Sequence, residues 1–247
     1  VLGEKEAVTC YEVHKYSEYQ QAIMYVLNYF QVFYFIYKRV DFRFDSYTVG
    51  FDEVEKLNKA LILTYFTLHY TDNIYHTEHL VTKEDLNDCY KASTREIESY
   101  RKIKEEPTGK VLSRLEIRSV NQHRVKNTFP MTRPEELAGK WYGELKECSP
   151  AYSKMLGTIN HSLLKHYMEN RAKYPTANEF MRHNMDFVFT AKQMEELYSS
   201  MGVQNPVQAR YNFIKRNKGL DTSFYTEKDI DKYVFYLIDR LDLFFQN

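Results

Sequence analysis

The chain has 247 residues and no net formal charge, so it is long enough to bury a core without cross-links, and its charge argues against a generally basic nucleic-acid-binding protein. Its three cysteines, Cys10, Cys89 and Cys148, are an odd and sparse set, which is not typical of a disulfide framework and favours a reducing intracellular compartment. No two of them have the Cys-x-x-Cys spacing of zinc or redox sites. Aromatic residues make up 16% of the chain, enough to cover contact surfaces as well as a core.

The first predicted element is a helix that begins at Tyr16 and ends near Arg39, with large apolar side chains on almost every face. Its uncharged part, from Ala22 to Tyr37, is shorter than the roughly 20 residues that a membrane span needs, and polar residues interrupt it. We therefore expect a buried helix at the centre of the fold and no membrane span.

Apolar residues at helical spacing continue through the rest of the N-terminal half. A short extended piece is predicted over 41–50, a second helix from Asp52 and a third from Thr82. Pro107 and Gly109 form the clearest break. They separate an N-terminal helical region, 1–106, from a C-terminal helical region, 107–247, unless both regions belong to one continuous domain.

The C-terminal half is predicted to be helical throughout, beginning with a basic helix or helix pair over 111–126. Capping residues, or Pro in a first helical turn, place further helix starts at Thr132, Ser149, Thr176, Thr190, Asn205 and Thr226. Strand-like alternation is almost absent. The predicted fold class is therefore all-α, a multi-helix orthogonal bundle of about ten helices without a substantial sheet.

Two segments, 80–104 and 194–219, resemble the helix-turn-helix motif of DNA-binding proteins. The second contains a glycine, Gly202, at its turn and a basic second helix. The candidate contacts to phosphates or bases are Arg95, Arg101, Lys102, Arg210, Lys215, Arg216 and Lys218. An ordinary helical hairpin with a solvated basic face has the same spacing, so nucleic-acid binding is the alternative function.

Arg118 and His123 are separated by four residues, and this pair resembles the active motif of HEPN-type helical ribonucleases. The resemblance implies a pair that stabilises a phosphorane and moves a proton, whereas the competing interpretation is a surface pair on a basic helix. A polar loop, and not a metal site, is predicted from His69, Asp72, His76, Glu78 and His79. We expect no catalytic residues, cofactor, metal or small-molecule ligand.

The function that the sequence favours is a non-catalytic helical structural or adaptor subunit of a larger assembly, in an organellar complex or a virus. Protein partners or self-association are expected through the apolar C-terminal residues Leu241, Phe244 and Phe245. The first residue is Val, which indicates import cleavage, polyprotein cleavage or truncation. A mitochondrion-like organelle and a virion are therefore both open as locations.

Overall fold

A computed structural model of the chain describes residues 15–31, 39–46, 51–69, 88–91, 95–103, 111–120 and 134–246. These residues form seven α-helices, one 3-10 helix and a four-stranded antiparallel sheet. The prediction of an all-α fold without a substantial sheet is therefore wrong, and so is the count of about ten helices.

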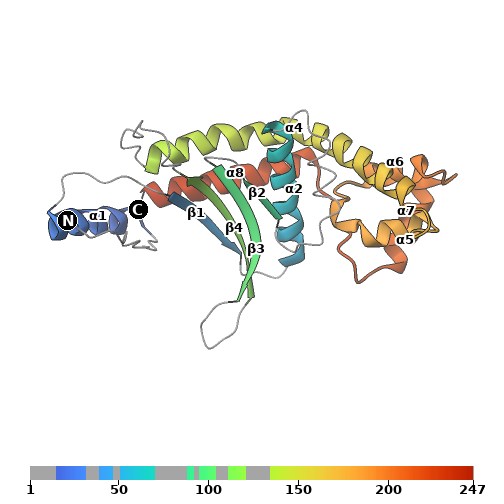
Figure 1. Cartoon of the computed structure of the whole chain (residues 1–247), viewed down its shortest axis with the longest axis horizontal. Helices are drawn as coiled ribbons and strands as arrows, with labels where there is room; N and C mark the ends of the chain where they lie inside the picture. Colours follow the sequence, from blue (N-terminus) through green and yellow to red (C-terminus); the bar gives the residue numbers. More distant parts are fainter. Residues whose placement is uncertain are drawn as a thin grey trace.

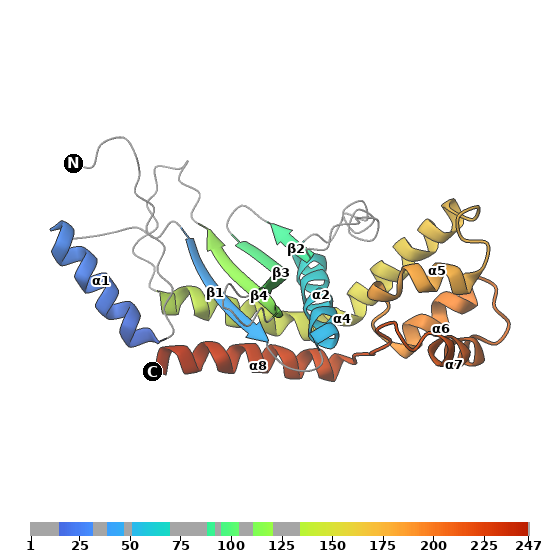
Figure 2. The same cartoon turned by 90° about the horizontal axis from the view of Figure 1, so that it is seen from below.

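The elements are α1 (Tyr16–Phe30), β1 (Arg39–Ser46), α2 (Phe51–His69), β2 (Asp88–Lys91), β3 (Arg95–Ile103), β4 (Val111–Val120), α4 (Pro134–Glu169), α5 (Ala177–His183), η1 (Met185–Phe187), α6 (Ala191–Ser200), α7 (Pro206–Arg216) and α8 (Glu227–Gln246). The strand order in the sheet is β1-β4-β3-β2. Helices α2, α4 and α8 cover one face of the sheet, as Figure 2 shows. Helices α5, α6 and α7, with η1, form a separate lobe at the far end of α4 (Figure 1).

The strands β3 and β4 occupy segments that were predicted to be helical. Along β4 the buried side chains Leu115 and Ile117 alternate with the charged side chains Arg114, Glu116 and Arg118. This period of two is that of a strand with one apolar face. Every second residue of this part of β4 is charged and points to the opposite face. Few apolar residues remain, and their spacing is also compatible with one side of a helix, which is why a helix was predicted. The predicted break at 107–109 lies outside the described residues, and β3 and β4 pair antiparallel on either side of it.

The core lies between the sheet and the three helices that cover it. Trp141 of α4 is 1% exposed, and its ring centroid lies 5.5 Å from that of Tyr65 in α2. The indole Nε1 of Trp141 donates a hydrogen bond of 3.0 Å to Ser119 Oγ of β4. Trp141 of α4 therefore contacts both α2 and β4, and burial of this aromatic pair stabilises the fold.

Helix α1 lies at the edge of the molecule, and the prediction of a central helix is wrong. It ends at Phe30, and Gln31 adopts a left-handed conformation with φ 52°. Arg39, the expected helix end, begins a strand. The outer part of α1 exposes Met24, Tyr25 and Tyr29. Among the described residues, no helix combines the length and the apolar character that crossing a membrane requires.

Helix α4 replaces two predicted helices, one starting at Thr132 and one at Ser149. It runs without a break through Pro150, which is exposed. A proline inside a helix removes one hydrogen bond and costs about 3 kcal/mol. The buried side chains of α4 continue at helical spacing on both sides of Pro150, at Leu145, Cys148, Tyr152 and Met155. Their packing against α2, α8 and the lobe offsets that cost.

Candidate nucleic-acid interface

The lobe of α5, η1, α6 and α7 begins where α4 ends, and local capping signals set its helices. Thr176 and Thr190 each accept a hydrogen bond from the backbone N–H three residues later, and both capping boxes are complete. The fully buried side chains of the lobe include Phe180, Met194 and Tyr198. The predicted helix starts at Thr176 and Thr190 are thus confirmed.

A tight turn joins α6 to α7. Gly202 has φ 84°, a left-handed conformation that glycine adopts without strain. The backbone N–H of Val203 donates to Tyr198 O at 3.0 Å. Asn205 then caps α7, since its side chain accepts from the N–H of Gln208, and Pro206 occupies the first turn. Two helices joined by a short turn with glycine are the arrangement of a helix-turn-helix motif.

Side-chain bonds fix the three helices of the lobe relative to one another. Arg210 Nε of α7 lies 2.7 Å from Glu195 Oε1 of α6. Tyr198 Oη of α6 donates to Asn178 Oδ1 of α5 at 2.7 Å. Arg210 was a candidate nucleic-acid contact, and its bond to Glu195 gives it a structural role between the two helices.

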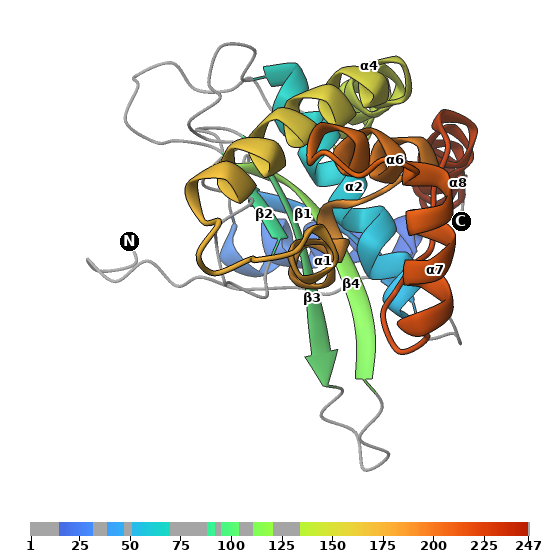
Figure 3. The same cartoon turned by 90° about the vertical axis from the view of Figure 1, so that its right-hand side faces the viewer.

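The outward face of α7 carries no acidic side chain. Val207 and Tyr211 are 54% and 61% exposed, and Lys215, Arg216 and Lys218 are exposed as well. Figure 3 shows α7 at the outside of the lobe, viewed from the end of the molecule. Residues 204–219 contain four cationic and no anionic residues. The surface at α7 is therefore positively charged, although the whole chain has no net charge.

The other predicted helix-turn-helix segment, 80–104, is not one. Its described parts are strands β2 and β3, which pair with each other. The candidate contacts Arg95, Arg101 and Lys102 lie on β3 and face Ser119, Ser113 and Leu112 of β4 in the register. The prediction of a third helix in this segment is therefore also wrong. Tyr90 of β2 and Ile97 of β3 are cross-strand neighbours and not residues on one side of a helix.

The ribonuclease resemblance also loses its structural context. Arg118 lies on β4, not on a helix, and His123 lies outside the described residues. The Arg118 guanidinium forms hydrogen bonds with Glu98 and Glu116 and is 3.4 Å from Glu96. An arginine that neutralises carboxylates in this way is a structural cation.

Arg118 belongs to a charged face of the sheet, opposite to the face that the helices cover, which sequence reasoning missed. This charged face is formed by Asp41, Arg43, Asp45, Glu96, Glu98, Tyr100, Arg114, Glu116 and Arg118, in three cross-strand rows. Arg114 makes a two-bond contact with Asp45, at 2.7 and 2.8 Å. Tyr100 donates to Glu116 Oε1 at 2.9 Å. The alternation of charged and apolar residues predicted a short extended piece at β1, and the same signal was present in β4, where a helix was predicted.

This face carries five carboxylates and three arginines, so its charges are paired but not fully compensated. Burial raises the pKa of Asp41, although Arg39 and Arg118 oppose that rise. The remaining carboxylates lie near Arg114 or Arg118, whose side chains are 7% and 11% exposed. Such paired charges contribute more to the register of the strands than to net stability.

Most of the predicted polar loop, for which a metal site was the competing interpretation, lies outside the described residues. His69 ends α2, and Asp72, His76, Glu78 and His79 lie outside the described residues. In the part of the chain that the structure describes, no group of three or more His, Cys, Asp or Glu side chains is arranged to hold a metal ion. Burial raises the pKa of the Cys148 thiol to about 12, which makes this cysteine a poor nucleophile or ligand.

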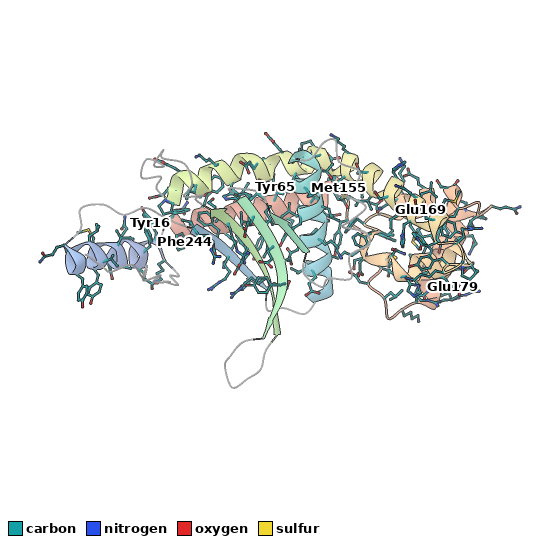
Figure 4. The ribbon with its side chains drawn as sticks, viewed as in Figure 1. Tyr16, Tyr65, Met155, Glu169, Glu179 and Phe244 are labelled. Atoms are coloured by element: carbon teal, nitrogen blue, oxygen red, sulfur yellow. The ribbon has the colours of Figure 1, made fainter. Side chains whose placement is uncertain are left out.

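The predicted interface residues lie at the junction of α8 with α1 and β1. Leu241 is buried. The Phe245 ring lies 5.4 Å from Tyr16 and 6.3 Å from Phe42, and Phe244 lies 6.3 Å from Tyr16. Figure 4 shows Tyr16 and Phe244 side by side at this junction. These rings already have partners within the chain.

Comparison with known proteins adds no relative: no family model, no curated protein and no solved structure matches the chain.

Proposed function

We propose that the protein binds double-stranded DNA through its α5–α7 lobe, with α7 in the major groove. The observation that carries the proposal is the geometry of α6, the Gly202 turn and α7, together with the exposed cations near the end of α7. No catalytic step is part of the proposal.

The dimensions of α7 suit this role. Its 11 residues span about 16 Å, and the major groove is about 12 Å wide and admits a helix. In the proposed complex, the exposed uncharged side chains Val207, Gln208 and Tyr211 face base edges. The exposed cations Lys215, Arg216 and Lys218 contact phosphates. The absence of net charge on the whole chain does not oppose binding, because the local field of a basic patch attracts DNA.

Binding of the full chain to a fluorescent duplex, followed by anisotropy across a salt series, tests the proposal. Changing Lys215, Arg216 and Lys218 to Glu is expected to lower the affinity about tenfold or more, and to reduce the salt slope by about 3. A control variant changes three exposed lysines of α4, Lys140, Lys146 and Lys154, to Glu, and is expected to bind as the unmodified chain does. If the unmodified chain shows no salt-sensitive binding, the proposal is wrong.

A second proposal is that the chain is a structural or adaptor subunit of a larger assembly. It is supported by two sets of exposed apolar side chains, Met24, Tyr25 and Tyr29 on α1, and Phe235, Tyr236 and Leu243 on α8. Exposed apolar surface of this kind is typical of contacts between proteins. DNA binding by the lobe is compatible with this role, because α1 lies at the opposite end of the molecule (Figure 1).

A further inference from the structure

The outward face of α7 has two chemically different halves. Its first two turns present Val207, Gln208 and Tyr211, which are exposed and uncharged. The cations Lys215 and Arg216 come in the last turn. Because contacts with phosphates position a protein and contacts with bases provide specificity, the first half is the one that would read sequence.

Gln208 is held in a defined arrangement. Its Nε2 donates a hydrogen bond of 3.0 Å to Asn212 Oδ1, one turn further along α7. An amide nitrogen has two N–H groups, so this bond leaves one N–H donor and the carbonyl oxygen Oε1 of Gln208 for another partner. One donor and one acceptor are what a bidentate contact with adenine N7 and N6 requires. The bond to Asn212 also reduces the conformational entropy that binding would cost.

The residues near Gln208 on α7 also favour recognition of an A·T pair. Val207 exposes methyl groups in the first turn, and an apolar side chain there fits the C5-methyl group of thymine. Guanine is most often read by Arg or Lys. The one cation in the first two turns of α7 is Arg210, and its bond to Glu195 of α6 turns it toward the lobe.

We propose that α7 reads an A·T step in the major groove, with Gln208 contacting adenine and Val207 contacting a thymine methyl group. This inference rests on the proposed DNA binding by the lobe, and it adds the class of sequence that is preferred. It predicts that binding sites with an A·T pair at this position are favoured over G·C by about tenfold.

Selection of duplexes from a pool with a randomised centre, using the full chain and followed by sequencing, tests the inference. The expected result is an enriched motif with an invariant A·T pair. Gln208→Glu should shift the preference at that pair toward C·G, because a carboxylate accepts a hydrogen bond from cytosine N4. If Gln208 had only a structural role, Gln208→Glu would not change which base pair is preferred.

Replacing thymine by uracil in the selected site tests Val207 separately. The unmodified chain should lose about fivefold in affinity for the site without the methyl group, whereas Val207→Ser, which replaces the methyl groups by a hydroxyl group, should bind both sites about equally. Salt-sensitive binding with no preference, or with a G·C motif, would overturn the sequence inference and leave the DNA-binding proposal standing. If no duplex is bound, both are wrong.

Discussion

Lys56 is a buried charge that joins α2 to the segment between α7 and α8. This lysine of α2 is 5% exposed, and its Nζ donates to Asp221 O at 3.2 Å and to Ser223 O at 2.9 Å. Both acceptors lie in the segment between α7 and α8. Burial lowers the pKa of Lys56 to about 8, although the negative charges of Asp221 and Asp186 oppose this effect.

The lowered pKa of Lys56 predicts a change of stability at alkaline pH. Between pH 8 and pH 10 the folded chain releases the Lys56 proton while the unfolded chain still holds it, so Lys56 contributes a rise of roughly 2 kcal/mol to the free energy of unfolding over this range. Burial raises the pKa of Cys148 and of Tyr152, and these groups contribute a fall over the same range, because the unfolded chain releases their protons first. Urea denaturation of the unmodified chain and of Lys56→Met at both pH values isolates the Lys56 contribution: from pH 8 to pH 10 the unmodified chain should gain roughly 2 kcal/mol relative to Lys56→Met. An equal change with pH in both proteins would contradict the prediction.

At the scale of single elements, the charged face of the sheet depends on its central arginine. Arg118→Ala should lower the free energy of unfolding by roughly 3 kcal/mol at pH 7, because carboxylates with little exposure lose their cation. The loss should be smaller at pH 5. Without Arg118 the pKa of Asp41 rises further, the folded chain binds more protons than the unfolded chain, and falling pH then adds stability.

Arg39→Ala is the matched control for Arg118→Ala. Arg39 also pairs with Asp41, at 2.9 Å, but its side chain is 55% exposed. Exposed pairs contribute less than about 1 kcal/mol. Equal losses in the two variants, measured by urea denaturation, would show that Arg118 has no special role.

The cap of α6 offers a second comparison between neighbouring residues. Gln193 is buried, and its side chain accepts from Phe189 N at 2.6 Å and donates to Phe187 O at 2.9 Å. Gln193→Ala should cost roughly 2 kcal/mol, because two buried backbone groups lose their partner. Thr190→Ala removes a cap alone and should cost about 1 kcal/mol. The order of the two urea midpoints checks this, and the reverse order would contradict it.

Sequence reasoning succeeded where local chemistry decides the element. The cap residues Thr176, Thr190 and Asn205 act within one helical turn, and the structure has helices at all three. It failed for β3 and β4, because their stability comes from partners far away in the chain, such as Asp45 for Arg114. The glycine of the α6–α7 turn was visible in the sequence, whereas the bond that occupies Arg210 was not.

At the scale of the whole molecule, α4 connects two ends with different surfaces. Its 36 residues span about 54 Å, from the neighbourhood of α1 to the lobe (Figures 1 and 2). The exposed apolar residues of α1 and the cations of α7 therefore lie at opposite ends. An assembly contact at α1 would leave α7 accessible.

This arrangement predicts that the isolated chain self-associates at micromolar concentration through exposed aromatic residues. Changing Tyr25 and Tyr29 of α1 to Glu should lower the mean mass measured by light scattering. Phe244→Ser with Phe245→Ser is the comparison, because it disturbs the internal contact with Tyr16 instead. A monodisperse monomer of the unmodified chain would contradict the assembly proposal.

The position of Trp141 has a practical consequence for spectroscopy. It is the single tryptophan of the chain, and it lies against Tyr65 in the sheet region, away from the lobe. The fluorescence of Trp141 will therefore report unfolding of the sheet region and will not respond to unfolding of the lobe. The far-ultraviolet circular dichroism signal, in contrast, contains contributions from all helices, including those of the lobe. Coincident transitions from the two signals would mean that α4 makes both ends unfold together, and separated transitions would give the stability of each end in one experiment.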